Sequence, residues 1–237
     1  MSQRSPEQPV CVLVNIPFEP KTEDVLQAMR ARKVTPGLTK LVEELAERSR
    51  RVARPKAMYT LTYVEVISER NISLDGKTFT SGVLRRLLEG IGRVFPFVTT
   101  CGTELDAIEV ASTDLMASYC LDSIKMLAVQ TARRHLQRYL QETYSLGKLS
   151  SMAPGSLEDW PIEQQRPLFD LLGDVEGGIG VRLTDKFLMI PVKSISGIFF
   201  PTEVRFESCQ LCQRERCTGR RAPYDPQSAA RLGVQNA

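Results

Sequence analysis

The chain has 237 residues, 42% of them hydrophobic and 25% charged, a composition that excludes a fibrous or disordered protein. Its 31 basic and 28 acidic side chains leave a net charge of +3, which is too even a balance to indicate a nucleic-acid partner. No stretch approaches the ~20 apolar residues of a membrane helix, and the opening MSQRSPEQPV has no apolar run of the kind that an export signal needs. We therefore expect a cytoplasmic protein with no membrane partner, whose six cysteines are thiols or metal ligands rather than disulfides.

The first half of the chain mixes helical and strand patterns. Apolar side chains at helical spacing predict a helix that Thr22 caps and a second one over residues 36–52. β-branched and aromatic residues predict strands over 58–67, over 72–79 with a turn in the middle, and over 93–100. Because the last of these carries a proline, we expect an edge strand or a bulged one.

The second half begins with the longest helical pattern, over residues 103–144, which predicts two helices with a bend near residue 118. A further helix is predicted over 162–172, and strands over 179–183 and 187–200. Since the connections between strands are short and irregular, they favour an antiparallel or mixed sheet flanked by helices, an α+β fold.

The sequence lacks the residue patterns that several classes of enzyme need. His135 is the single histidine, and its place on the inward face of a predicted helix indicates a core or half-buried side chain. No strand–Ser–helix turn stands near it, and no glycine-rich phosphate loop follows a predicted strand. The adjacent pair Glu158-Asp159 is better explained by solvation than by acid–base chemistry. The sequence therefore has few of the residue patterns that are typical of a hydrolase, a kinase or a dehydrogenase.

One region carries a more particular pattern. It runs through Ser151-Met-Ala-Pro-Gly-Ser156, Trp160-Pro161, Leu168-Phe-Asp-Leu-Leu172, Leu183-Thr-Asp-Lys-Phe-Leu-Met189 and Ser194-Ile-Ser-Gly-Ile-Phe-Phe200. This order and spacing resemble the activation domain of cobalamin-dependent methionine synthase. That family has an R-P-A-P-G-Y loop, a short helix ending in paired leucines, L-T-E-S-F-A-M and S-V-S-G-W-Y-F in the same order.

The resemblance is clear over residues 149–200, and Ile16-Pro-Phe-Glu-Pro20 resembles stand-alone members of the group. It implies a single C-shaped α+β domain around a twisted antiparallel sheet, which we expect over residues 10–205. It also implies a partner, a corrinoid-binding methyltransferase or methionine synthase module. In that family the domain binds S-adenosylmethionine, closes over the cobalamin domain and permits reductive methylation of inactive cob(II)alamin.

The resemblance also points to a ligand site at Ala153, Pro154, Gly155 and Phe199. Proline stiffens such a loop, and Gly155 lets the backbone approach a ligand or a flat macrocycle closely. The alternative is a plain Pro-Gly turn without a ligand.

Three positions depart from the family's pattern. Its loop arginine corresponds to Ser151, its loop tyrosine to Ser156, and its later tyrosine to Phe199. An arginine fork suits a carboxylate, and the methionine part of S-adenosylmethionine carries one. The loss of these polar groups argues against use of S-adenosylmethionine in the family's way.

A cysteine-rich segment, residues 206–219, follows the last predicted strand. Cys209 and Cys212 form a C-x2-C pair, which suits zinc or an iron–sulfur cluster, and Cys217 adds a third thiol. We consider Cys101 the candidate fourth ligand, with water or an exogenous ligand as alternatives. Free thiols on a flexible tail are the other interpretation, and we expect residues 220–237 to be disordered.

Three functions follow from these patterns. The first is an accessory protein that docks on a corrinoid methyltransferase and assists its reductive reactivation. The electron would come from an electron-donor protein, as a further partner, or from a cluster at Cys209, Cys212 and Cys217. The second is a metal- or cluster-stabilised interaction module without reactivation activity. The third is a methyl-transferring enzyme that still uses S-adenosylmethionine through other contacts.

Overall fold

The computed structural model describes residues 9–203, 206–215, 220 and 222–234. The strands are β1 (Cys11–Leu13), β2 (Lys56–Tyr59), β3 (Thr62–Val66), β4 (Asn71–Leu74), β5 (Lys77–Thr80), β6 (Arg93–Thr100), β7 (Leu149–Met152), β8 (Arg182–Leu183), β9 (Met189–Ile190) and β10 (Ser194–Pro201). The helices are α1 (Thr22–Ala28), α2 (Pro36–Val52), α3 (Gly82–Leu87), α4 (Leu115–Thr143), α5 (Gln165–Leu172), α6 (Val175–Ile179) and α7 (Pro226–Arg231). Short 3-10 turns lie at Glu104–Ala107, Ile162–Gln164 and Ser208–Gln210.

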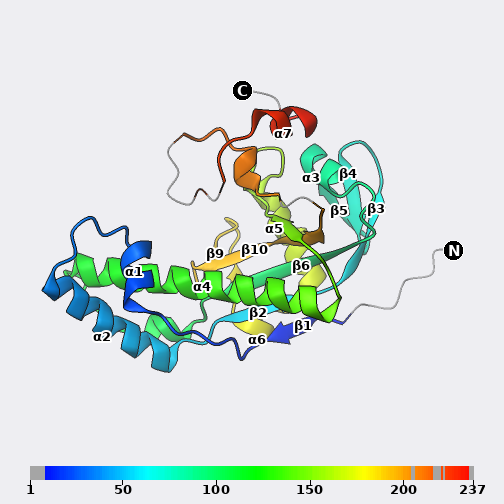
Figure 1. The fold of residues 1–237 in the computed structure, drawn as a ribbon. Helices are drawn as coiled ribbons and strands as arrows, with labels where there is room; N and C mark the ends of the chain where they lie inside the picture. Colours follow the sequence, from blue (N-terminus) through cyan, green and yellow to red (C-terminus); the bar gives the residue numbers. More distant parts are fainter. Residues whose placement is uncertain (1–8, 204–205, 216–219, 221, 235–237) are drawn as a thin grey trace.

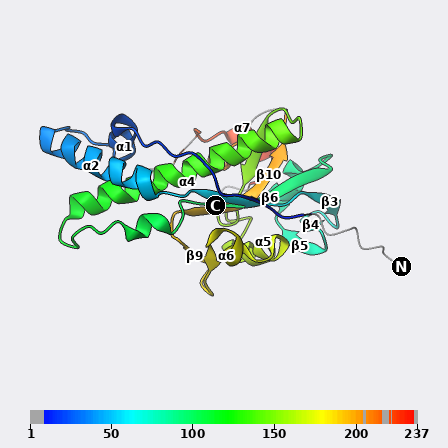
Figure 2. The ribbon, with the colours of Figure 1, turned by 90° about the horizontal axis from the view of Figure 1, so that it is seen from below.

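Within these described residues, eight strands form one antiparallel sheet in the order β1-β2-β6-β3-β4-β5, and β10 joins it between β6 and β7. β8 and β9 form a separate hairpin. Helices α1, α2 and α4 lie on one side of the sheet, and α5 and α6 on the other (Figure 2). The predicted α+β fold with an antiparallel sheet flanked by helices is confirmed.

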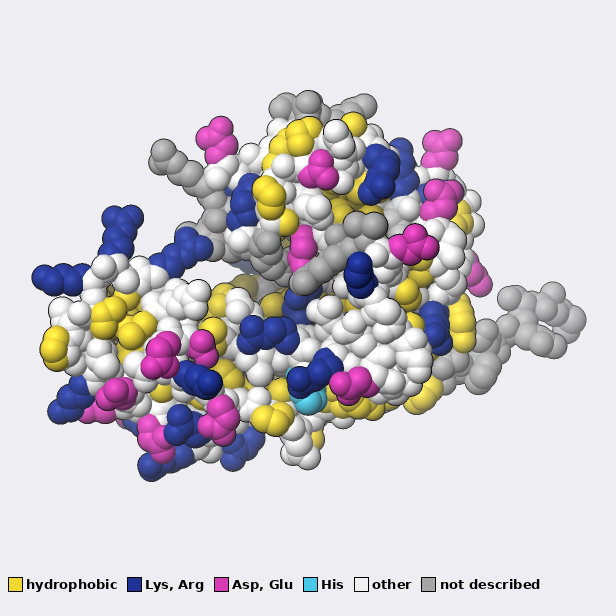
Figure 3. Space-filling view, viewed as in Figure 1, with side chains coloured by type: hydrophobic (Ala, Val, Ile, Leu, Met, Phe, Trp, Pro, Cys, Tyr) yellow, Lys and Arg dark blue, Asp and Glu magenta, His cyan; other side chains and the backbone are white. Residues whose placement is uncertain are grey.

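The two faces of the sheet bury separate cores. Alternation along β10 shows this, because Ile198 and Phe200 pack with α5 and α6 while Phe199 packs with α4. The helical layer and the segment after β10 lie on opposite sides of a hollow, so the outline is the expected C shape (Figures 1 and 3). Basic and acidic side chains alternate over the helical layer in Figure 3, and this face carries no patch of a single sign.

Several predicted elements are wrong in detail. Residue 179 belongs to α6, and the strand predicted over 187–200 is divided into β9 and β10. Residues 103–144 form one long helix, α4, preceded by a 3-10 turn and an irregular segment, and no second helix precedes α4 in this range. Asp114 ends the irregular segment because its carboxylate accepts a hydrogen bond from the Ala117 amide and caps α4. Leu105 and Ile108 continue the helix-like spacing of apolar residues because they pack into the core beneath α2 and α4, although they do not belong to an α-helix.

β6 is a central strand despite its proline. It pairs with β10 on one side and with β2 and β3 on the other. Pro96 lies opposite the short break between β2 and β3, where its carbonyl still accepts a hydrogen bond from the Thr60 amide. Since no strand residue faces the missing N–H there, the proline costs the sheet little.

The end of the chain also differs from its prediction. Residues 226–231 form α7, which Asp225 caps through bonds from the Gln227 and Ser228 amides. Ala229 and Leu232 are buried in the core on the α5 side, so the expected disorder from residue 220 is wrong for this part. No helix in the described part of the chain is long and apolar enough to cross a membrane.

Candidate functional site

The predicted ligand loop follows β7 directly. Gly155 has a φ of +76°, a conformation that favours glycine, and its amide donates to the Trp160 carbonyl at 2.7 Å. A Cβ placed on Gly155 would lie 2.7 Å from Cδ1 of Ile162. Ser156 closes the turn, since its amide and hydroxyl both donate to the Ala153 carbonyl. The loop is therefore rigid and depends on glycine at position 155.

Trp160 anchors the far end of this loop. Its side chain is fully buried and meets the edge of Phe79 at a centroid distance of 6.4 Å. The indole N–H donates to Oε1 of Gln164 at 3.1 Å, and the Gln164 amide also pairs with the Thr80 backbone. The loop is thus tied to the β4–β5 hairpin.

The carboxylate of Asp159 caps α3. It accepts bonds from the Ser81 hydroxyl, from the Val83 amide at 2.9 Å and from Arg70 at 2.7 Å. Burial by itself raises the pKa of Asp159, but these hydrogen bonds and the charge of Arg70 outweigh it and lower the pKa. The expectation of a merely solvated side chain is wrong for Asp159.

A cationic side chain, Arg133, contacts Ser151, the position at which the family's pattern has an arginine. Arg133 of α4 donates through Nη2 to Oγ of Ser151 at 2.6 Å, and its guanidinium carbon lies 5.3 Å from the centre of the Phe199 ring. Ser151 and Phe199 are directly opposed in the β7–β10 register, and Phe97 stacks on Phe199 at 4.3 Å. No sequence signal pointed to Arg133, because it lies 18 residues before Ser151 on a different element.

The structure brings Cys209 and Cys212 together on one turn. The Cys212 amide donates to the Cys209 carbonyl, and both residues are half-buried. Arg220 donates to both of these carbonyls at 3.2 Å, which fixes the turn. Cys217, the third predicted ligand, lies outside the described residues. Among the residues that the structure describes, no group of three or more His, Cys, Asp or Glu side chains could hold a metal ion, so a metal site at this turn stays a prediction.

Cys101 is not brought to this turn. It is fully buried in the core beneath α2 and α4, whereas Cys212 packs against the core on the opposite face of the sheet. Burial, and then the charge of Asp106, raises the pKa of the Cys101 thiol to about 11. His135 is half-buried, as expected.

The loop and the cysteine turn share a cavity of about 690 Å³. Gly155 and Ser156 line one part of it and Cys212 another, with Arg70 and Arg86 nearby. Gly155 of the predicted ligand loop and Cys212 of the cysteine-rich segment, about 57 residues apart in the sequence, thus line the same cavity. A volume of this size is typical of small-molecule sites.

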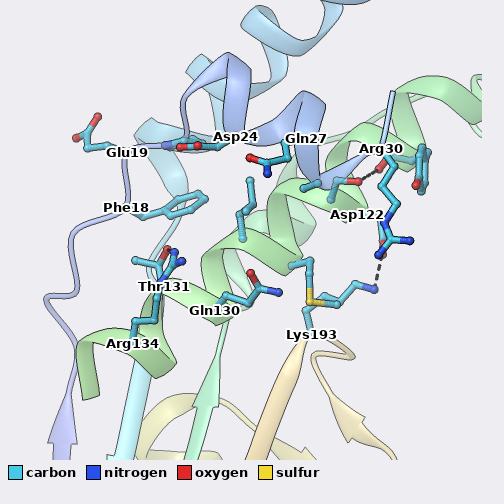
Figure 4. A pocket seen from close by; sticks show the side chains of 16 residues that line it. Phe18, Glu19, Asp24, Gln27, Arg30, Asp122, Gln130, Thr131, Arg134 and Lys193 are labelled. Carbon is cyan, nitrogen blue, oxygen red and sulfur yellow. Dashed lines mark hydrogen bonds and ion pairs between the residues drawn. The ribbon is translucent and has the colours of Figure 1, made fainter. Parts of the chain in front are cut away.

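A larger groove of about 1010 Å³ runs between α1 and α4. Figure 4 shows Phe18 and Arg134 toward one end and Lys193, in an ion pair of 2.9 Å with Asp122, toward the other. The lining residues come from three separate stretches of the chain, 18–30, 119–134 and 193, so no motif in the sequence predicted the groove. Phe18, Glu19 and Pro20 line part of it, and they belong to the segment that resembles stand-alone members of the family.

Comparison with known proteins supports the fold. No family model and no curated protein matches the chain. Among solved structures, it is similar to a crystal structure of the MetH reactivation domain bound to AdoHcy, with a TM-score of 0.62 and 14% identity. The similarity covers 85% of this chain and 82% of that one. At this identity it shows the fold alone.

Proposed function

We propose that this protein docks on a corrinoid-carrying methyltransferase and assists reductive reactivation of its cob(II)alamin. The observation that carries the proposal is the similarity of fold to the MetH reactivation domain over most of both chains. The loop after β7, which is held by the hydrogen bonds from Gly155 to Trp160 and from Ser156 to Ala153, is the ligand loop in this proposal. In the proposed reaction an external donor gives one electron to cob(II)alamin. The resulting cob(I)alamin takes a methyl group from S-adenosylmethionine, which leaves methylcob(III)alamin and S-adenosylhomocysteine.

Docking can be tested without the chemistry. A corrinoid-loaded methionine synthase fragment without its own reactivation domain is titrated with this protein in the cob(II)alamin and methylcob(III)alamin states. The proposal predicts a complex whose affinity depends on the state of the corrinoid. A complex of equal affinity in both states would instead support the interaction module without reactivation activity.

A metal ion or cluster at the cysteine turn is part of the proposal. Cys209 and Cys212 would supply two thiolates, Cys217 a third, and water or a partner's side chain the fourth position. When bound, an iron–sulfur cluster would supply one-electron chemistry, whereas zinc would only stabilise the turn. Iron, zinc and acid-labile sulfide in anaerobically purified protein decide between them, with the Cys209→Ser/Cys212→Ser/Cys217→Ser variant as control.

A further inference from the structure

The segment Cys209-Gln210-Leu211-Cys212 is a tight turn of defined geometry. The Cys212 amide donates to the Cys209 carbonyl at 3.3 Å, and Leu211 has a φ of −99° and a ψ of −6°, close to the values for the third residue of a type I turn. Such a turn brings its first and fourth Cα atoms within about 7 Å, and a disulfide spans about 4.4–6.8 Å between Cα atoms. The two thiols at these positions therefore have the spacing of a disulfide-forming pair.

The turn is held in place from two sides. On the inner side, Leu211 is 2% exposed and packs into the core with α5 and α6. On the other side, Arg220 donates through Nη1 to the Cys209 carbonyl and through Nη2 to the Cys212 carbonyl, both at 3.2 Å, so one guanidinium spans the turn. Because these contacts fix the backbone, the two thiols have little conformational freedom to lose when they join.

The thiols of the turn differ from the core cysteines in their access to reagents. Cys209 and Cys212 are half-buried, and Cys212 lines the cavity of about 690 Å³. Cys101 and Cys120 are fully buried, and burial raises the pKa of each thiol to about 11. Cys11 is half-buried too, but its strand β1 is separated by β2, β6 and β10 from β7, beside which the turn lies. An oxidant in solution therefore reaches a ready pair of thiols at the turn.

We propose that Cys209 and Cys212 are a redox modification site, where a small-molecule disulfide oxidises them to a reversible disulfide. One cysteine thiolate attacks the small disulfide, forms a mixed disulfide and releases one thiolate. The second cysteine attacks this mixed disulfide, closes the bond between Cys209 and Cys212 and releases the second thiolate. The two cysteines lose two electrons, which the small disulfide gains, and their two protons pass to the released thiolates.

The inference goes beyond the proposed function and does not depend on a corrinoid partner. A metal site at this turn needs further ligands, whereas a disulfide needs only these two thiols. The two chemistries exclude each other, because a metal binds the thiolates that the disulfide consumes. Oxidation should therefore prevent metal binding at the turn, and reduction should restore it.

The test uses the full chain, purified without oxygen and freed of metal by a chelator, with oxidised glutathione as the probe. After the reaction the remaining thiols are blocked with N-ethylmaleimide, and the peptides are identified by mass spectrometry. The parent should contain a bond between Cys209 and Cys212, while Cys101 and Cys120 react with the blocking reagent only after unfolding. Cys212→Ser should instead keep glutathione as a mixed disulfide at Cys209, because the second thiol is missing.

The equilibrium with glutathione measures how well the turn is organised. At fixed concentrations of oxidised and reduced glutathione, the ratio of disulfide to dithiol should be at least about 10-fold higher in the folded parent than in the parent unfolded by guanidinium chloride. Arg220→Met should lower the folded ratio about 3- to 10-fold, the range expected for the loss of about one hydrogen bond, because the reduced turn then opens part of the time. The control is Arg214→Met, which removes the charge of an exposed residue in the same segment and should change the ratio by less than about 2-fold.

Four results would overturn the inference: a turn that keeps both thiols or only a mixed disulfide, a bond from either cysteine to Cys217 in place of the predicted one, a folded ratio no higher than the unfolded ratio, or an unchanged ratio in folded Arg220→Met. The comparison of folded with unfolded parent needs no variant, so it still tests the inference if Arg220→Met does not fold.

Zinc uptake by the oxidised and the reduced chain separates this inference from the proposed metal site. Uptake by the reduced chain alone supports the exclusion of metal by the disulfide, and equal uptake by both forms would overturn it. If neither form takes up zinc or iron while the disulfide forms, only the metal site of the proposed function is lost.

Discussion

Gly155→Ala should destabilise the protein through two separate effects. The φ of +76° costs an alanine about 1–2 kcal/mol relative to glycine. The new Cβ would also lie 2.7 Å from Cδ1 of Ile162, and an overpacked contact of this kind costs about 1–3 kcal/mol. We expect the free energy of unfolding to fall by about 2–5 kcal/mol and the melting temperature by about 4–20 °C.

Urea unfolding followed by fluorescence measures this cost directly, because Trp160 is the only tryptophan of the chain and its carbonyl accepts from the Gly155 amide. The control is Gly37→Ala, since no atom lies within 4 Å of a Cβ at position 37 and the residue is in the first turn of α2. That change should be neutral or stabilise the protein by up to about 1 kcal/mol.

A double-mutant cycle separates the two effects. Ile162→Val removes Cδ1, after which the nearest Ile162 atoms would be Cβ at 3.3 Å and Cγ1 at 3.4 Å. In this background Gly155→Ala should cost only about 1–2 kcal/mol, which is the backbone part. A Gly155→Ala variant as stable as the parent, or an equal cost in both backgrounds, would refute the reasoning.

Three further predictions concern other parts of the molecule. Asp159→Asn should lower the free energy of unfolding by about 1–2 kcal/mol at pH 7. Because the folded-state pKa of Asp159 is lowered, its contribution is present above pH about 4 and is lost as the pH falls through the folded pKa, so parent and variant should converge in acid unfolding curves. Iodoacetamide at pH 7.5 should alkylate Cys212 in metal-free protein at least about 10-fold faster than Cys101, because burial raises the pKa of the Cys101 thiol to about 11. The two rates are measured by peptide mass spectrometry, and equal rates would contradict the burial of Cys101. Removal of residues 226–237 should cost about 2–3 kcal/mol by exposing the core under Leu232, and an unchanged melting temperature would show that α7 contributes nothing.

The elements with a local signal were predictable from the sequence. The predicted helix over 36–52 has the observed bounds of α2, because a proline at its start and an apolar stripe define it locally. The hairpin with a turn at Asp75-Gly76 is β4–β5, since both turn residues have positive φ. Long-range pairing had no local signal, so the central place of β6 opposite the β2–β3 break could not be deduced from the proline alone.

The candidate site was predictable only in part. The order of motifs over 149–200 located the loop at 153–155, whose rigidity then follows from Gly155 and Trp160. Arg133 lies on a helix where arginine usually means a solvated face, and only the packing of α4 on the sheet places it against Ser151. A comparison of residue types at matched sequence positions cannot detect an arginine that another helix brings to the same place.

We propose that this protein promotes reactivation of a corrinoid partner. The most direct measurement is the rate at which a corrinoid-loaded methionine synthase fragment, without its own reactivation domain, passes from cob(II)alamin to methylcob(III)alamin. The change is followed by visible absorbance with a one-electron donor and S-adenosylmethionine present. Stoichiometric addition of this protein should accelerate the conversion, and heat-denatured protein should not. A rate unchanged by the folded protein, under conditions where the two are shown to bind, would contradict it.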